Sequence, residues 1–192
     1  MVSKPVLAGL IVLAVLALWT FYGVYVSMTT PEPDYTVIES LEDNVEIRHY
    51  SPQIWASVIA EDQNKAFNLL FRYISGNNDR KEKIEMTAPV ITRAEEDGLY
   101  MAFVMPERFD QKSIPQPLSE DLKIEAIEER KLATITFSWY ANEKTYQNKL
   151  DVLMKTLDEN QISTMELPML MQYNDPWTPP FARRNEVALM VN

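Results

Sequence analysis

The chain has 192 residues, of which 46% are hydrophobic and 24% are charged, and its formal net charge is −10. It contains no cysteine and one histidine, which excludes disulfides, thiol catalysis, cysteine-ligated zinc and multi-histidine metal centres. Four glycines leave no glycine-rich phosphate loop, and the acidic charge argues against a nucleic-acid partner.

The first thirty residues contain an apolar segment. Residues 6–28 carry no charged side chain, and a helix of this length can cross a bilayer core of about 30 Å. Lys4 precedes the segment, whereas Glu32 and Asp34 follow it, so the positive-inside rule places the N-terminus in the cytoplasm. Aromatic residues gather near its C-terminal end, as they do at lipid–water boundaries, namely Trp19, Tyr22 and Tyr25.

A cleaved secretory signal is the alternative interpretation of this segment. Signal cores usually run about 7–15 residues and end at a small-x-small site, whereas this run is longer and lacks such a site. We therefore predict that residues 1–30 form a transmembrane anchor, or an uncleaved signal. Residues 31–192 are then one acidic domain outside the cytoplasmic membrane, which is the periplasm if the cell is bacterial.

The first half of this domain follows a tether at residues 29–34, TTPEPD, whose prolines favour an extended and stiff chain. We expect Asn64 to cap the helix of this half and Gly76-Asn77 to end it. Pro89 is expected to end or bulge a strand, because it has no N–H to donate. The predicted elements are strands over 45–50 and 54–60, a helix over 64–75, and strands over 84–93 and 99–105.

The second half repeats the same order. Strands are expected over 122–127 and 132–138, a helix after Asn142, and strands over 168–173 and 186–191. The succession strand, strand, helix, strand, strand therefore occurs twice. It predicts an α+β fold, a distorted antiparallel β-barrel built from two βαββ-type repeats with two helices outside, preceded by one N-terminal transmembrane helix.

Three motifs together resemble the SOUL haem-binding protein family, over roughly residues 35–192. They are EIRHY at 46–50, KIEMTAPV at 83–90 and YNDPWTPPFARRNEV at 173–187. The resemblance implies a twisted barrel of two repeats that binds haem or another tetrapyrrole in a shallow apolar groove beside the first-repeat helix. The fold is also similar to the effector-binding domains of bacterial drug-sensing regulators, which hold flat hydrophobic ligands.

The resemblance also implies site residues. His49 matches the histidine of EIRHY, a tentative haem iron ligand, and the helix match places four residues near the groove, namely Phe67, Leu70, Phe71 and Ile74. His49 shares a strand face with Val45 and Ile47, so we expect its imidazole to face apolar surroundings. A partly buried structural histidine is the alternative, just as a core helix equally explains the apolar helix positions.

The C-terminal motif leaves two questions open. Trp177 and Phe181 could plug one end of the barrel or stack on a ligand. The basic pair Arg183-Arg184 is expected to bind Asp175 or Glu186 locally rather than an anionic ligand.

We therefore predict a membrane-tethered protein that holds or transfers haem or a related tetrapyrrole reversibly and is not an enzyme. The alternative is an anchored interaction module that takes another flat hydrophobic ligand or a partner protein, whose identity the sequence does not indicate. A hydrolase that uses a groove carboxylate is a third hypothesis, although no GxSxG nucleophile motif is present.

Overall fold

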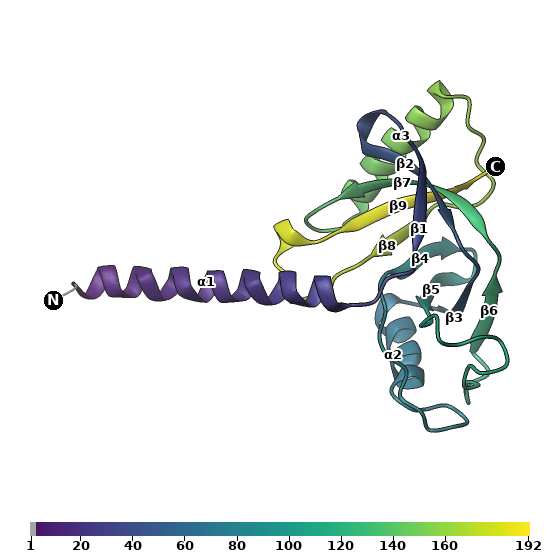
Figure 1. Ribbon diagram of the computed structural model, residues 1–192, viewed down its shortest axis with the longest axis horizontal. Helices are drawn as coiled ribbons and strands as arrows, with labels where there is room; N and C mark the ends of the chain where they lie inside the picture. The colour runs from purple at the N-terminus through teal and green to yellow at the C-terminus, as the bar shows by residue number, and fades with distance from the viewer. Residues whose placement is uncertain (1–2) are drawn as a thin grey trace.

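A long apolar helix projects from a strongly curled β-sheet that carries two further helices on its outer face (Figure 1). The structure is a computed structural model that describes residues 3–192. The projecting helix, α1, spans Lys4–Thr29, with Pro5 in its first turn, where a missing N–H costs no helical hydrogen bond. Because α1 projects from the domain (Figure 1), most of its side chains are exposed, and because it has no polar face, the exposed surface is almost wholly apolar.

Helix α1 meets the length and composition of a membrane span over Lys4–Val26, and it is the one helix among residues 3–192 that does. Only 6% of its apolar window is buried against the rest of the protein. A core helix of a soluble domain would be mostly buried, so the low burial of α1 shows that it is not a core helix. A signal sequence near the N-terminus has the same length and composition.

All nine strands form one antiparallel sheet in the order β1-β2-β7-β9-β8-β4-β5-β3-β6. The order from β2 to β6 is symmetric between the two repeats. If β2, β3, β4 and β5 are exchanged with β6, β7, β8 and β9, the order reads the same from the other end of the sheet. The predicted duplication is thus confirmed, and β1 is an added edge strand. The strands are β1 Tyr35–Ser40, β2 Val45–Tyr50, β3 Gln53–Ala60, β4 Val90–Glu95, β5 Gly98–Val104, β6 Leu122–Ile127, β7 Arg130–Phe137, β8 Met169–Gln172 and β9 Asn185–Val191.

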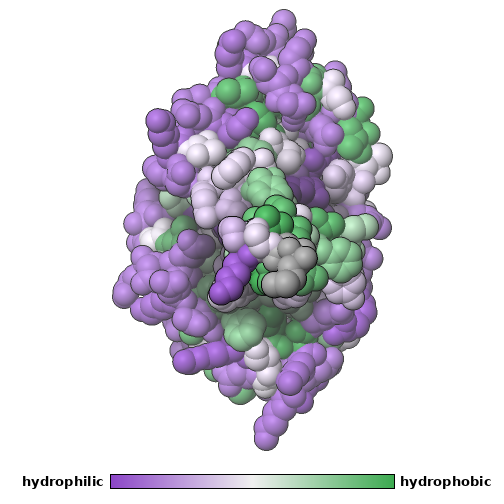
Figure 2. Space-filling view, turned by 90° about the vertical axis from the view of Figure 1, so that its left-hand side faces the viewer, coloured by the Kyte–Doolittle hydropathy of each residue, from purple (hydrophilic) through white to green (hydrophobic). Residues whose placement is uncertain are grey.

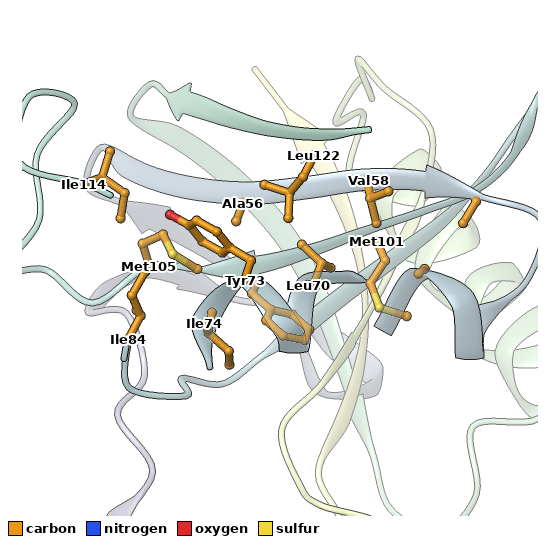
Figure 3. Packing of buried hydrophobic residues seen from close by; sticks show 13 residues of the cluster. Ala56, Val58, Leu70, Tyr73, Ile74, Ile84, Met101, Met105, Ile114 and Leu122 are labelled. Atoms are coloured by element: carbon orange, nitrogen blue, oxygen red, sulfur yellow. The ribbon is translucent and has the colours of Figure 1, made fainter. Parts of the chain in front are cut away.

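The two repeat helices, α2 (Gln63–Ile74) and α3 (Glu143–Glu159), each cover one half of the outer face, and short 3₁₀ turns lie at Glu42–Asn44 (η1) and Pro180–Ala182 (η2). Figure 3 shows Leu70 and Tyr73 of α2 directed at side chains of the sheet, among them Val58 and Met101, and Ile74 belongs to the same buried cluster. The inner face of the curled sheet encloses a separate cluster that includes Tyr50, Trp55 and Tyr100. The α+β fold with helices outside a curled antiparallel sheet agrees with the prediction.

Three local predictions need correction. Helix α2 starts at Gln63 because the carboxylate of Asp62, and not Asn64, accepts the Lys65 N–H at 2.9 Å and caps it. Strand β4 starts only at Val90, so residues 84–89 belong to a loop whose Ile84 N–H bonds the last α2 carbonyl at 2.8 Å. Strand β1 was not predicted, because nearly all its side chains are exposed and show no alternation.

The tether is fixed to the domain. The carbonyl of Pro31 accepts the Ala88 N–H at 2.9 Å, and the carboxylate of Glu32 lies 2.8 Å from the Arg184 guanidinium. These contacts fix the segment to the loop that precedes β4 and to the loop between β8 and β9. Residues 31–34 are therefore part of the folded domain and do not act as a free spacer.

Candidate functional site

A cleft of about 1020 Å³ opens where the tether meets the ends of β3, β5 and β6, and we call it the tether cleft. Five parts of the chain line it, namely residues 31–34, 51–54, 85 with 87, 104–107 with 109–111, and 126–129. The volume is at the upper end of the range of small-molecule sites. No single stretch of sequence makes this cleft, because its walls come together only when the sheet curls.

The deep wall of the tether cleft is apolar. Ile54 and Phe109 line the cleft and also pack against the buried cluster under α2, which contains Leu70 and Met105 and which we call the α2 cluster. Val104 and Ile127 complete this wall. A flat hydrophobic ligand can therefore replace water here and gain contact with the first-repeat core.

The rim of the tether cleft is acidic. Seven carboxylate side chains line it, and no lysine, arginine or histidine does, among the residues that the structure describes. Two arginines outside the lining pair with rim carboxylates: the Arg184 guanidinium lies 2.8 Å from Glu32, and the Arg108 guanidinium lies 3.4 Å from Glu85 and 4.6 Å from the centre of the Phe109 ring. The acidic members are Glu32, Asp34, Glu85, Glu107, Asp110, Glu128 and Glu129.

Arg130 lies beside the cleft without a carboxylate partner within 4 Å among the described residues. It donates to the Gln53 side chain at 3.0 Å and to the Glu128 carbonyl at 3.4 Å, both cleft residues, but its buried Nε has no partner. Its guanidinium lies 4.7 Å from the Trp55 ring centre, and burial lowers the pKa of Arg130 to about 10, so it stays charged at neutral pH. Arg130 therefore supplies positive charge next to the cleft, with one buried nitrogen that lacks a hydrogen-bond partner.

His49 lies behind the rim of this cleft. Its Nε2 is 3.8 Å from the carboxylate of Glu129, which lines the cleft, and its side chain is 41% exposed. The expected apolar surroundings are not observed. Val45 and Ile47, on the same strand face, pack in the buried cluster under α3, but this cluster does not extend to His49. The imidazole is thus accessible and has an acidic neighbour.

The four predicted α2 residues do not share one surface. Leu70 and Ile74 are in the core, with exposed fractions of 0% and 4%. Phe67 and Phe71 are exposed and stack on each other with ring centres 5.8 Å apart. Figure 1 places β2, which carries His49, beside α3, and α2 on the other half of the sheet. The tether cleft lies between His49 and α2, since its lining includes Glu129, which contacts His49, and also Ile54 and Phe109, which pack against the α2 cluster.

A buried ionic network on the inner face joins two of the sequence motifs. The Glu186 carboxylate, fully buried, accepts from Arg48 at 2.8 Å and from Arg184 at 2.9 Å. It also accepts from Tyr173 at 2.9 Å and Thr136 at 3.1 Å. Burial opposes ionisation, but the two arginines outweigh it and hold the pKa of Glu186 below its usual value.

This network gives EIRHY and the C-terminal motif a structural role. The predicted local pairing is confirmed for Arg184 with Glu186, whereas Arg183 donates to the backbone carbonyls of Pro176 and Thr178. Sequence reasoning missed Arg48 as a partner, because it alternates with apolar residues as a surface side chain would. Within residues 3–192 no three His, Asp or Glu side chains are placed to hold a metal ion.

Comparison with known proteins agrees with the motifs. The family model described as SOUL heme-binding protein matches residues 30–190. Heme-binding protein 2 from Homo sapiens is 30% identical over 161 residues, covering 76% of this chain and 77% of that protein. Heme-binding protein 1 from Mus musculus is 31% identical over 139 residues, covering 69% of this chain and 73% of that protein.

Two solved structures share the fold. The EcmrR C-terminal domain superposes with a TM-score of 0.56 at 12% identity, covering 82% of this chain and 98% of that one. A hydrolase from Listeria innocua superposes with a TM-score of 0.52 at 10% identity, covering 86% of this chain and 95% of that one. At these identities the likeness extends to the architecture alone.

Proposed function

The chain belongs to the SOUL haem-binding protein family, and on that premise we propose that it binds haem or a related tetrapyrrole reversibly in the tether cleft while α1 holds the domain at a membrane. The observation that carries this proposal is the cleft itself, a space of about 1020 Å³ with an apolar wall and the unpaired Nε of Arg130 beside it. The relatives are named for haem binding, which supports binding or transfer rather than turnover.

The residues of the tether cleft fit a haem in one orientation. Haem supplies an iron centre for ligand coordination within a flat apolar disc, and its two propionates need cations or water. The apolar wall of Ile54, Val104 and Phe109 suits the disc, whereas the acidic rim repels the propionates. The propionates would therefore be directed to Arg130 or to solvent.

His49 is the residue of this chain that we assign to the iron. Its Nε2 faces Glu129, and a histidine ligand commonly donates its second ring N–H to a carboxylate, which orients the ring and raises its basicity. Phe67 and Phe71 form the other accessible apolar surface of the first repeat, and we keep them as the alternative binding face.

We further propose that α1 is a retained anchor with its N-terminus in the cytoplasm and residues 31–192 outside. The exposure of apolar side chains on every side of α1 supports insertion in lipid, and Lys4 before the span supports this orientation. The docked tether supports a domain held close to the membrane surface.

The acidic rim favours a second candidate, a flat hydrophobic cation. Seven carboxylates around one cleft attract positive charge and raise the local concentration of a cationic ligand. Such a ligand would use the same apolar wall without needing Arg130. An experiment must therefore separate an anionic from a cationic planar ligand at one site.

Hemin titration of the full chain in lipid nanodiscs tests both candidates, with empty nanodiscs as the control for haem in lipid. We expect saturation near one equivalent and a shifted Soret band. Ala126 lines the cleft and is exposed, so Ala126→Trp should fill the cleft without disturbing the core and weaken binding at least tenfold, about 1.4 kcal/mol. Phe71→Ala is the matched control on α2 and should leave the affinity unchanged.

The variants give distinct outcomes. A Soret band altered by His49→Ala would identify the imidazole as ligand, whereas an unchanged spectrum and affinity would remove it. Loss of binding in Phe71→Ala, with Ala126→Trp unaffected, would move the site to the α2 face. If hemin does not saturate but a planar cationic dye does, and Ala126→Trp abolishes the dye signal, the second candidate replaces the first.

A further inference from the structure

Four large aromatic side chains are exposed together on two loops of the domain, and we call them the aromatic tip. Trp139 and Tyr140 lie in the loop between β7 and α3, and Trp177 and Phe181 lie in the loop between β8 and β9. Their exposed fractions are 59%, 55%, 73% and 54% in that order. Exposed aromatic side chains gathered in one place mark an interaction surface.

The two loops are bound to each other. The Trp139 N–H donates to the Pro180 carbonyl at 2.8 Å, and the Asn185 side chain donates to the Trp139 carbonyl at 3.0 Å. Trp139 has a φ of 74°, a left-handed conformation that is unfavourable for a bulky residue. These two hydrogen bonds hold it there, with its indole exposed at the end of the loop.

The aromatic tip is also in contact with α1. The indole N–H of Trp19 donates to the Trp177 carbonyl at 2.6 Å. Gly23 allows close approach, because a Cβ at that position would lie 2.6 Å from Pro179 Cδ. Figure 1 shows both loops reaching along α1 toward its N-terminus, and Figure 2, which looks from the side where α1 projects, shows the hydrophobic helix at the centre of a largely hydrophilic outline.

These contacts fix the depth of the tip relative to a membrane. Trp19 precedes Val26, the last residue of the candidate span, by seven residues, which is about 10 Å at 1.5 Å per residue. When α1 spans a bilayer, the loop beside Trp19 lies that far on the membrane side of the end of the span. A depth of about 10 Å inside the end of the apolar span is hydrocarbon and not interface, so the contact favours a bilayer whose outer boundary lies near Trp19. Tryptophan and tyrosine are preferred at such a boundary, and Trp19, Tyr22 and Tyr25 gather there.

Several backbone groups of the β8–β9 loop form hydrogen bonds with side chains of the same loop. The Asp175 carboxylate accepts the N–H groups of Trp177 and Thr178, each at 2.8 Å. The Arg183 guanidinium donates to the carbonyls of Pro176 and Thr178 at 2.6 and 2.9 Å. Since backbone groups without partners are costly in lipid, such internal pairing suits a loop that enters the interface.

We propose that the aromatic tip inserts into the interfacial layer of the same bilayer that α1 spans, so that the domain docks on lipid at a fixed orientation. This inference rests on the proposed anchoring by α1 and adds a second membrane contact to it. The occupant is a lipid surface. A second copy of the chain or a partner protein would cover the same side chains without lipid contact.

The absence of cysteine makes the test direct, because one introduced cysteine is the only thiol of the full chain. Nitroxide labels on Trp177→Cys and Phe181→Cys report the collision rates with O₂, which concentrates in lipid, and with a water-soluble nickel chelate. Leu118→Cys, 63% exposed in the segment between β5 and β6, is the control, and Leu13→Cys, 63% exposed in α1, reports the anchor. All four variants are reconstituted in phosphatidylcholine vesicles.

We expect the ratio of O₂ to nickel collisions at positions 177 and 181 to exceed that at 118 several-fold and to fall below that at 13. Nickel access at 177 and 181 equal to that at 118, with position 13 in lipid, would refute docking but leave the anchor intact. Nickel access at position 13 as well would refute both. Low collision rates with both reagents at 177 would indicate cover by protein and would also refute lipid docking.

Discussion

Replacing Glu186 with glutamine tests the buried network that joins β2, β7, β9 and the β8–β9 loop. The carboxylate accepts from four donors between 2.8 and 3.1 Å, with Arg48 and Tyr173 on one oxygen and Arg184 and Thr136 on the other. A glutamine has one carbonyl oxygen, and its amide group would turn a donor toward the donors on the other side. One arginine therefore loses its acceptor.

The expected loss in free energy of unfolding follows from which groups remain buried. Each arginine keeps one other carboxylate, Glu46 for Arg48 and Glu32 for Arg184, both at 2.8 Å. Arg48 has only 4% of its side chain exposed, so water cannot replace Glu186 around it, whereas Arg184 is 29% exposed. Breaking one partner of a buried ion pair costs about 3–5 kcal/mol. We expect Glu186→Gln to fall in this range, and Glu159→Gln, at a 62% exposed side chain paired with Lys155, to cost under about 0.5 kcal/mol.

Urea unfolding of the full chain in detergent, followed by circular dichroism, measures this difference. With an m-value of about 1–3 kcal/mol/M, the midpoint of Glu186→Gln should fall by more than about 1 M. A value within about 1 kcal/mol of Glu159→Gln would refute the reasoning. Equal costs of Arg184→Met in the wild type and in Glu186→Gln would likewise show that the network does not act as a unit.

Three further predictions use other parts of the structure. The pKa of Glu186 is lowered in the folded state, so its contribution to stability is present above the usual carboxyl pKa near 4.5 and is lost as the pH falls through the folded-state value. Glu186→Gln lacks this titration. Urea midpoints measured across acidic pH should therefore fall less steeply in this variant than in the wild type. Leu70→Ala should cost about 2–5 kcal/mol because Leu70 is fully buried, whereas Phe71→Ala, at a 49% exposed side chain, should cost under about 1 kcal/mol; equal costs would contradict the assignment of the α2 faces. Gly23→Leu cannot keep the contact with Pro179, so a nitroxide at position 177 should gain access to the nickel chelate, and unchanged access would show that α1 does not position the loop.

The fold could be predicted from sequence where burial follows the period of the element. Strand β2 alternates Val45 and Ile47 with more polar residues, and α3 starts at the cap Asn142 as expected, with its side chain accepting the Thr145 N–H at 3.0 Å. Residues 84–89 show the limit of this reasoning. Ile84 and Ala88 are buried, but they pack as part of a loop without a strand partner, so burial of apolar residues does not imply strand pairing there.

The candidate site was less predictable, because it depends on contacts between distant segments. The tether cleft is formed by five separate segments, none of which carries a signal of its own. Arg130 became a candidate only when its buried Nε proved to have no partner. The family resemblance indicated the ligand class and directed attention to His49 and α2, and the structure adds the cleft between them.

The tether has two roles at once, since residues 31–34 end the anchor and also line the cleft. Pro31 follows the last residue of α1 by two positions, which an extended chain covers in about 7 Å. With α1 in a bilayer, the tether therefore keeps this wall close to the membrane, so a hydrophobic ligand has a short path between the cleft and the lipid phase. Capture by the protein then competes with partition into lipid, and the apparent affinity for a hydrophobic ligand should decrease as the lipid-to-protein ratio rises.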